Sequence, residues 1–335
     1  MRSTSCSLLV LCYLAVSPGS ARSQPEFDAP RWLPPSKRDV ETREARKVMP
    51  SRILLAPGAA DTVAARRGEP QTLRVRVYAT RDYQAQTVGW RDRFHRLIEH
   101  INDLAVSWPG VQFEVVEMRS WDPPGGEQNM EMMLAKLEQL DPGMDVDWVV
   151  GLSSALTLVP TSLHNFGAGR PFGRHFILRG LNDLMEADVL RQQFDAVKPS
   201  ECERILAERK HHKEQVIFLH EWAHSLGAIH AHGSQLLMNP AYDPEQSRLC
   251  GPNAHILAVA LRHRRGAAEH PDWQEEMRRE IQRYVEATPF PDWDAKGRAE
   301  LLALLAKEAP AGDKARGTPS EPKNTAAQPV VSPRR

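Results

Sequence analysis

The sequence predicts an α/β domain over residues 71–265, with a twisted and mostly parallel sheet. Segments with strand periodicity alternate along the chain with amphipathic helical segments, and this order builds parallel sheets. A histidine-bearing helical pattern ending at residues 220–230 then leads into a short irregular part. The chain of 335 residues is long enough to bury a sizeable core, as one large domain or two small ones.

Three strands are expected ahead of the histidines. LRVRVY (73–78) alternates apolar residues with arginines, which predicts a half-exposed strand. VQFEVVEM (111–118) predicts a second strand, and the apolar run VDWVVGL (146–152) predicts a central one. The glycine-rich residues 164–180 are expected to form a loop and an edge strand, with the apolar run 176–178 as that strand.

Helical spacing of apolar residues predicts helices over 94–105 and 130–140. The methionines of the second helix are expected to pack in the core rather than bind a ligand. A third helix is expected to run from Glu201 to Leu226, with Ser200 and Glu203 forming a capping box at its start.

The remaining C-terminal sequence predicts helices followed by a disordered tail. Residues 253–264 are amphipathic, and the Pro-Asp-Trp sequences at 271–273 and 291–293 each begin a helical pattern. We therefore expect a helical extension over residues 266–308. Residues 309–335 hold almost no large apolar groups and are expected to be disordered.

The N-terminus has the three parts of a secretory signal peptide. Arg2 precedes an apolar stretch at 6–16, and small residues follow up to Ala21. Cleavage after Ala21 would make the protein secreted or periplasmic, although a short buried helix is the alternative interpretation of residues 1–21. Residues 22–70 are rich in proline, arginine and alanine and are expected to be a linker or pro-segment, in which the dibasic Arg66-Arg67 is a possible processing point.

Two cysteines, Cys202 and Cys250, remain after removal of the signal peptide. Export favours a disulfide between them over two buried thiols.

Charge and composition exclude two classes of partner. Lysine plus arginine and aspartate plus glutamate both number 43, so no basic surface for nucleic acid is expected. No apolar run reaches the length of a membrane-spanning helix.

The segment HEWAHSLGAIH (220–230) predicts a zinc site. His220 and His224 share one helix face because they lie four residues apart, and Glu221 lies beside them. Gly227 can end the helix and return the chain, so that His230 becomes a third ligand. Three protein ligands leave zinc an open position for water, as in catalytic sites. The alternative is a buried helix with hydrogen-bonded histidines, which the full spacing disfavours.

This segment resembles the motif of the metzincin zinc proteases. Met238 follows eight residues after His230, as in the methionine turn of that family, and MNPAY (238–242) is most similar to the matrixins. The resemblance implies that Met238 packs beneath the zinc ligands and that Pro240 and Tyr242 line a substrate pocket. Ala231 stands where matrixins have serine, so the subfamily stays open.

The resemblance implies a zinc endopeptidase with one catalytic zinc ion and a peptide or protein substrate, and the N-terminal pattern implies that it is exported. Glu221 would act as general base toward a water held by the zinc. An extended peptide is expected to pair with an edge strand from residues 164–179. Two alternatives remain: a zinc-binding interaction protein without turnover, which the intact Glu221 disfavours, and a zinc amidase acting on a non-protein substrate.

His164 and His175 are candidates for a second metal site. No acidic residue occurs between positions 161 and 180, which favours solvated or hydrogen-bonded histidines instead. The oligomeric state is not set by any of these patterns.

Overall fold

The computed structural model describes residues 36–47, 49–55, 70–106, 108–125, 129–156, 162–181, 183–267 and 270–307. The expected signal peptide, the dibasic Arg66-Arg67 and the expected tail at 309–335 lie outside these residues. Within the described part of the chain, no helix combines the length and apolar character needed to cross a membrane.

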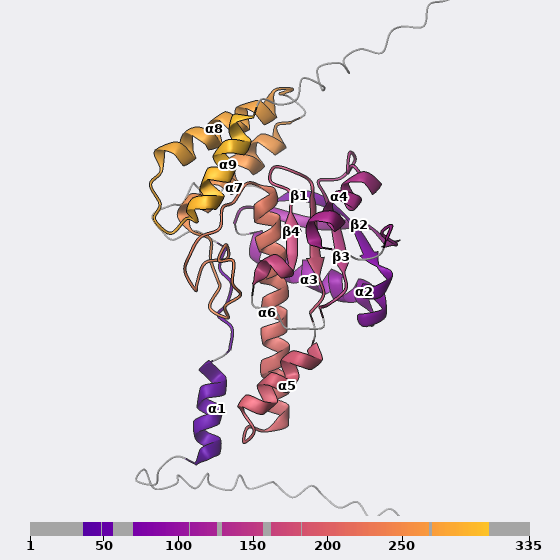
Figure 1. Ribbon diagram of the computed structural model, residues 1–335, viewed down its shortest axis with the longest axis vertical. Coiled ribbons are helices and arrows are strands. Elements are labelled where there is room, and N and C mark those ends of the chain that lie inside the picture. Colours follow the sequence, from indigo (N-terminus) through magenta and orange to yellow (C-terminus); the bar gives the residue numbers. More distant parts are fainter. Residues whose placement is uncertain are drawn as a thin grey trace, which may run out of the picture.

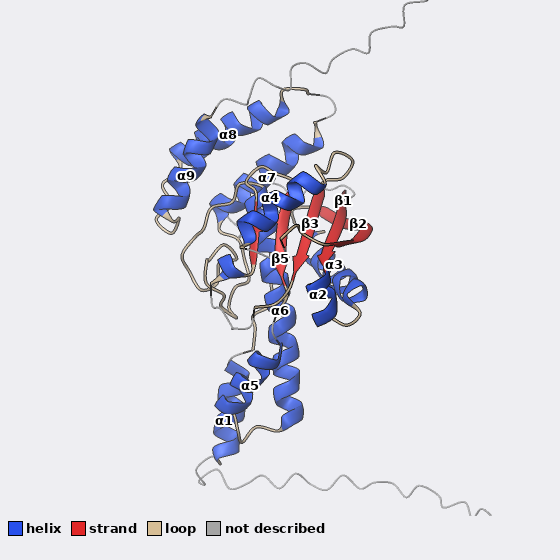
Figure 2. Cartoon of the chain, turned by 45° about the vertical axis from the view of Figure 1, so that its right-hand side comes forward, coloured by secondary structure: helices blue, strands red, loops and turns tan. Residues whose placement is uncertain are grey.

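A five-stranded sheet in the order β2-β1-β3-β5-β4 forms the centre of the fold (Figure 2). The strands are β1 (Gln71–Thr80), β2 (Val111–Trp121), β3 (Trp148–Ser153), β4 (Gly167–Gly169) and β5 (His175–Arg179). Every pairing is parallel except that of β4 with β5. The predicted α/β class with a mostly parallel sheet is confirmed, and β3 is central as expected.

Two expectations about the strands were wrong. β1 is buried from Val75 onward rather than half exposed, because β2 and β3 flank it and helices cover both faces of the sheet. The apolar run 176–178 belongs to β5, which lies inside the sheet, while the glycine-rich β4 forms the edge. The edge strand does lie within residues 164–179, as predicted.

Helices α3 (Trp90–Ala105) and α6 (Pro199–Ser225) contribute to the main core on one face of the sheet. Helix α4 (Met130–Leu140) packs on the other face, and Met130 and Met133 are buried there as predicted. The short helix α2 (Arg81–Gln86) follows β1 directly. Helix α6 continues past the sheet, where α1 (Lys37–Lys47) and α5 (Asp183–Gln193) pack against its first half (Figure 1).

Helix α6 is continuous over 27 residues, but its start differs from the prediction. Lys198 is the N-cap, Pro199 occupies the first turn, and no side chain caps the helix. The predicted capping box of Ser200 and Glu203 is therefore wrong. Proline suits the first helical position because it has no N–H to satisfy, so the helix begins before Ser200.

The three C-terminal helices share the main hydrophobic core. They are α7 (Gly251–Arg265), α8 (Trp273–Ala287) and α9 (Ala295–Ala306). Met277 and Ile281 of α8 and Leu301 of α9 are buried in the same cluster as the residues of the sheet. The expected boundary at residue 265 thus does not divide the core.

Part of the expected linker is built into the domain. The backbone N–H of Ser51 donates to the carbonyl of Pro244 at 2.8 Å, and that of Leu54 to Ser247 at 2.6 Å. Ile53 and Leu55 insert into the main core. Residues 49–55 are therefore a structural segment, and removal of all residues up to 70 would empty two core positions.

The structure contradicts the predicted disulfide, because Cys202 and Cys250 are not joined. Both thiols are buried, but in different hydrophobic clusters. Cys202 lies in the first turns of α6, against Phe194 and Ile205, whereas Cys250 precedes α7 in the main core. Burial raises the pKa of the Cys202 thiol, which lowers its reactivity.

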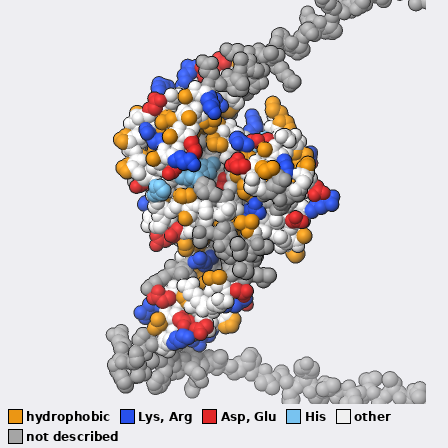
Figure 3. Space-filling model, viewed as in Figure 1, with side chains coloured by type: hydrophobic (Ala, Val, Ile, Leu, Met, Phe, Trp, Pro, Cys, Tyr) orange, Lys and Arg blue, Asp and Glu red, His pale blue; other side chains and the backbone are white. Residues whose placement is uncertain are grey.

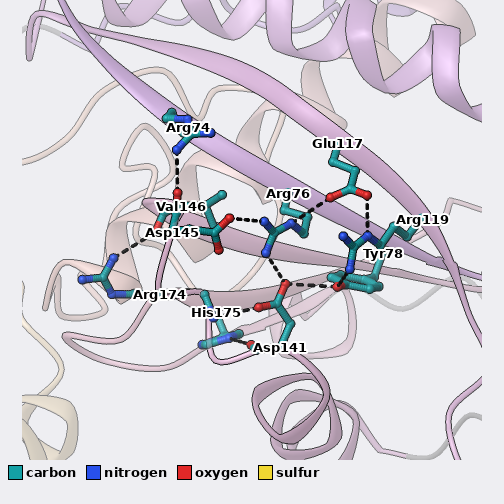
Figure 4. Close-up of polar contacts among 11 residues, drawn as sticks. Arg74, Arg76, Tyr78, Glu117, Arg119, Asp141, Asp145, Val146, Arg174 and His175 are labelled. Carbon is teal, nitrogen blue, oxygen red and sulfur yellow. Dashed lines mark hydrogen bonds and ion pairs between the residues drawn. The ribbon is translucent and has the colours of Figure 1, made fainter. Parts of the chain in front are cut away.

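A polar network lies on the α4 face of the sheet (Figure 4). The buried guanidinium of Arg76 donates to Asp141 at 2.8 Å, and the hydroxyl of Tyr78 donates to the same carboxylate at 3.1 Å. Burial alone would raise the pKa of Asp141, but these bonds and the N–H of Gly143 hold it below its usual value. The ring of His175 bonds the Asp141 carbonyl at 2.6 Å. The network thus anchors the loop that leads into β3 and fixes His175 as a hydrogen-bonded residue.

Neighbouring leucines test whether residues 49–55 are structural. Leu55 is 3% exposed and Leu54 is 60% exposed. We expect Leu55→Ala to lower the free energy of unfolding by about 2–5 kcal/mol, because it leaves a cavity in the core. The matched Leu54→Ala change should stay within about 0.5 kcal/mol of the wild type. Denaturant unfolding of both variants measures this, and equal effects would show that the segment is not docked.

Candidate metal centre

Three imidazole nitrogens converge at the C-terminal end of α6. The Nε2 atom of His224 lies 3.0 Å from those of His220 and His230, and the latter two are 3.2 Å apart. Tetrahedral ligands at about 2.0–2.1 Å from zinc would be about 3.3 Å apart, so the triangle fits one zinc ion. Within the described residues, no other group of three or more His, Cys, Asp or Glu side chains could hold a metal.

Two backbone carbonyls orient these rings. The Nδ1 atom of His220 bonds the Leu237 carbonyl at 2.7 Å, and that of His224 bonds the Ala228 carbonyl at 3.0 Å. A carbonyl can only accept, so each Nδ1 carries the proton and each Nε2 keeps a lone pair. This is the tautomer that a metal ligand requires, and such contacts also fix ring orientation.

Gly227 reverses the chain after α6, as the sequence predicts. Its φ is +95°, in the region that favours glycine, and its N–H donates to the His224 carbonyl at 2.9 Å. A Cβ at this position would also lie 2.5 Å from the Phe172 ring. The reversal brings His230 back to the end of the helix.

The C-terminal part of the chain holds the backbone of the third histidine, which the sequence did not predict. The N–H of Asp294 donates to the His230 carbonyl at 2.9 Å, and Ala231 forms an antiparallel bridge with Trp293. The N–H of His232 donates to the carbonyl of Asp292 at 2.7 Å. Residues 230–232 and 292–294 therefore form a short two-stranded contact that holds the backbone of His230.

Asn253 is a second residue that sequence reasoning missed. Its side chain is fully buried at the start of α7, and its amide donates to the Ile229 carbonyl at 2.7 Å. Its Oδ1 atom accepts from the Ile229 N–H at 3.1 Å and from the Trp293 ring at 3.2 Å. A buried amide with satisfied partners sets the position of the residue before His230. An asparagine inside an otherwise amphipathic helix was the available signal.

The segment that was expected to form a methionine turn lies against the histidine motif. Met238 is buried, and its carbonyl accepts from the N–H of Ala231 at 3.0 Å. The preceding residue, Leu237, supplies the carbonyl that orients His220. The segment therefore contacts both sides of the histidine motif through its backbone.

Pro240 and Tyr242 lie further from the site. The Pro240 carbonyl accepts from the N–H of Leu163 at 2.7 Å. The Tyr242 hydroxyl bonds Nδ1 of His212 at 3.0 Å, two turns of α6 before His220. The Nζ atom of Lys213 lies over the Tyr242 ring, 5.2 Å from its centroid. Neither residue lines the large cleft at the metal centre. Their assignment to a substrate pocket stays a prediction, while Tyr242 has a clear packing role.

Glu221 lies beside the histidines, beneath strand β4. It is 3% exposed, and burial, followed by the negative charge of Glu131, raises its pKa well above the usual carboxyl value. A Cβ on Gly167 would lie 2.5 Å from its carboxyl group, and one on Gly169 would lie 2.7 Å from its carbonyl oxygen. Two glycines of the edge strand therefore leave room for Glu221.

A cleft of about 1060 Å³ opens onto the metal centre. Its walls come from the start of α4, from β4, from the turn after Gly227 and from α9, and Glu221, His224 and His230 lie along it. Figure 3 shows histidine side chains on this face, in a hollow between the surface of the C-terminal helices and that of the sheet. The site is thus open to a molecule larger than water.

No protein-family model matches the sequence, and no curated protein does either. Among solved structures, the archaemetzincin of Methanopyrus kandleri is similar with a TM-score of 0.38 and 18% identity, covering 59% of this chain and 99% of that chain. Metalloproteinase-II of Bacteroides fragilis is similar with a TM-score of 0.34 and 14% identity, covering 66% of this chain and 60% of that chain. Alignments this loose assign no function, so the site must be judged by its own geometry.

Substitution of Gly167 tests the packing of Glu221 under the edge strand. We expect Gly167→Ala to lower the free energy of unfolding by about 1–3 kcal/mol, because the new methyl group overlaps the carboxyl group. Gly266→Ala is the matched control, since a Cβ there meets nothing closer than 3.6 Å. Denaturant unfolding of the two variants measures the difference. Equal stabilities would mean that Glu221 lies elsewhere in solution.

The raised pKa of Glu221 predicts a pH-dependent cost in metal-free protein. Above the usual carboxyl pKa, the unfolded state releases this proton, whereas folding must retain it or bury a charge. We therefore expect metal-free Glu221→Gln to be more stable than metal-free wild type at pH 7. The advantage should shrink as the pH falls through the usual carboxyl range. Thermal unfolding in chelator at several pH values measures it, and a constant difference would contradict the burial of this carboxyl.

Proposed function

We propose that this protein is a zinc-dependent endopeptidase. The observation that carries the proposal is the convergence of three Nε2 atoms beside a buried carboxyl in an open cleft, with His220 and His224 held in the tautomer that binds zinc. His220, His224 and His230 would hold one ion. The resemblance of their segment to the metzincin motif supports the same interpretation.

A bound zinc ion would polarise a substrate carbonyl and lower the pKa of a water molecule to about 7. Glu221 would serve as the general base and acid, because its carboxylate could accept a proton from the attacking water and return it to the leaving amine. Glu221 is suited to this work by its position, because it lies along the cleft next in sequence to His220.

Strand β4 is suited to align an extended peptide. It is the last strand of the sheet, and all three of its residues line the cleft. Backbone groups at such an edge can pair with a peptide without requiring a particular sequence. This favours a peptide substrate over a small non-protein amide.

The test compares Glu221→Gln with the wild type on a generic protein substrate. Glutamine keeps the size of the side chain but cannot accept the proton, so cleavage should fall by about 10²–10⁴ while zinc content stays near one ion per chain. Glu208→Gln on the exposed part of α6 is the control and should cleave normally. A chelator should abolish wild-type cleavage, and added zinc should restore it.

The competing proposal is a zinc-binding interaction protein without turnover. The enclosure of Glu221 beneath Gly167 is the observation that favours it, because a general base must reach a water molecule and this enclosure restricts the access of water to the carboxyl group. Wild-type protein that holds zinc but cleaves no peptide would support this alternative. Export through a signal peptide belongs to either proposal, and sequencing of the mature N-terminus tests it.

A further inference from the structure

Helix α9 forms one wall of the cleft at the metal centre. Its residues along the cleft are Gly297, Glu300, Leu301 and Leu304. They recur at the spacing of one helix face, so the helix lies along the cleft with a single side turned toward it. This wall comes from the C-terminal end of the described chain, far in sequence from the histidine motif.

Several contacts fix this wall relative to the zinc ligands. The Asp294 side chain caps α9 by accepting from the N–H of Gly297 at 2.6 Å, and the Asp294 N–H donates to the His230 carbonyl. Leu301 and Leu305 are buried in the main core. Asp294 therefore connects the start of α9 to His230, so this wall of the cleft cannot move far without moving His230.

Among the α9 residues that line the cleft, Gly297 lies beside the residue that precedes His230. A Cβ at Gly297 would lie 3.3 Å from the side chain of Ile229, the residue before His230. Leu304 is two turns further along α9, which corresponds to about 10 Å along the helix axis. An extended peptide covers this length in about three residues. A peptide that runs along α9 from the level of Gly297 would therefore bring a residue about three positions from the cleaved bond to Leu304.

The chemistry of this part of the cleft is apolar with a polar rim. Leu304 is half-buried, whereas the Glu300 side chain is exposed and lies 3.7 Å from Lys296 on the same helix. Leu156 and Ile229 also line the cleft. An aliphatic surface with charges at its edge binds an apolar side chain and fixes its orientation through the rim.

We propose that Leu304 is a specificity-determining residue that contacts an apolar side chain of the peptide, about three positions from the cleaved bond. The proposal rests on the proposed endopeptidase activity and adds a substrate preference to it. Helix α9 would then contribute to substrate recognition, in addition to the contacts that the C-terminal part of the chain makes with His230.

The test is cleavage of a peptide library that varies each position around the cut, by the zinc-loaded full chain. The wild type should prefer large apolar residues at one position about three from the cut. Leu304→Glu should lower kcat/KM for those peptides by about tenfold or more and favour lysine or arginine there, because a carboxylate replaces an apolar contact. Peptides too short to reach α9 should be cleaved at the wild-type rate.

Ala303→Glu is the matched control, because it places the same charge on the exposed side of α9, outside the cleft lining. It should leave the cleavage profile unchanged. If Leu304→Glu does not fold, Leu304→Ala replaces it and should shift the preference toward bulkier aromatic residues. Leu304 variants that cleave peptides with the wild-type preference would overturn the role of Leu304 and leave the endopeptidase activity standing. A zinc-loaded wild type that cleaves no peptide would overturn the endopeptidase activity, and this inference with it.

Discussion

The metal centre depends on the orientation of imidazole rings by backbone carbonyls. Two histidines on one helix turn bring nitrogen atoms near each other, but each ring can flip or present the wrong tautomer. The carbonyls of Leu237 and Ala228 remove that freedom, since each accepts from one Nδ1. Both carbonyls come after α6 in the chain, so the orientation of the rings depends on the chain reversal at Gly227 and on the segment around Leu237.

Glu221 imposes the second constraint, because it is an ionisable group with almost no contact with solvent. Such a group favours folding only when it is neutral or its charge is compensated. Its enclosure by the glycines of β4 brings the edge strand onto the helix at close range. The same closeness places the backbone that can align a peptide directly above the carboxyl group. The close packing of β4 on α6 explains why the edge strand has glycine at positions 167 and 169.

The spacing of residues along the sequence predicted the features that depend on neighbouring residues. The histidines four residues apart, the glycine turn and the buried methionine stripe of α4 all follow from helix geometry, and the parallel sheet follows from the alternation of elements. The burial of β1, the docking of Ile53 and Leu55 and the separation of Cys202 from Cys250 depend instead on which segments meet in space. The start of α6 was also misplaced, because the capping-box pattern points to Ser200 as the N-cap, whereas Pro199 in the first turn places the N-cap at Lys198.

The contacts that hold His230 show why the rest of the site could not be predicted from the histidine motif alone. His220 and His224 are fixed relative to each other by one helix, whereas the third ligand depends on Asp294, Trp293 and Asn253, which lie up to about sixty residues later. Metal affinity rises when ligands are held in place before binding, since less ordering remains to be done. Binding of zinc in turn stabilises whatever holds its ligands. If zinc binds as proposed, its binding free energy also stabilises the contacts of the C-terminal helices with His230. These helices already share the main hydrophobic core with the histidine helix α6.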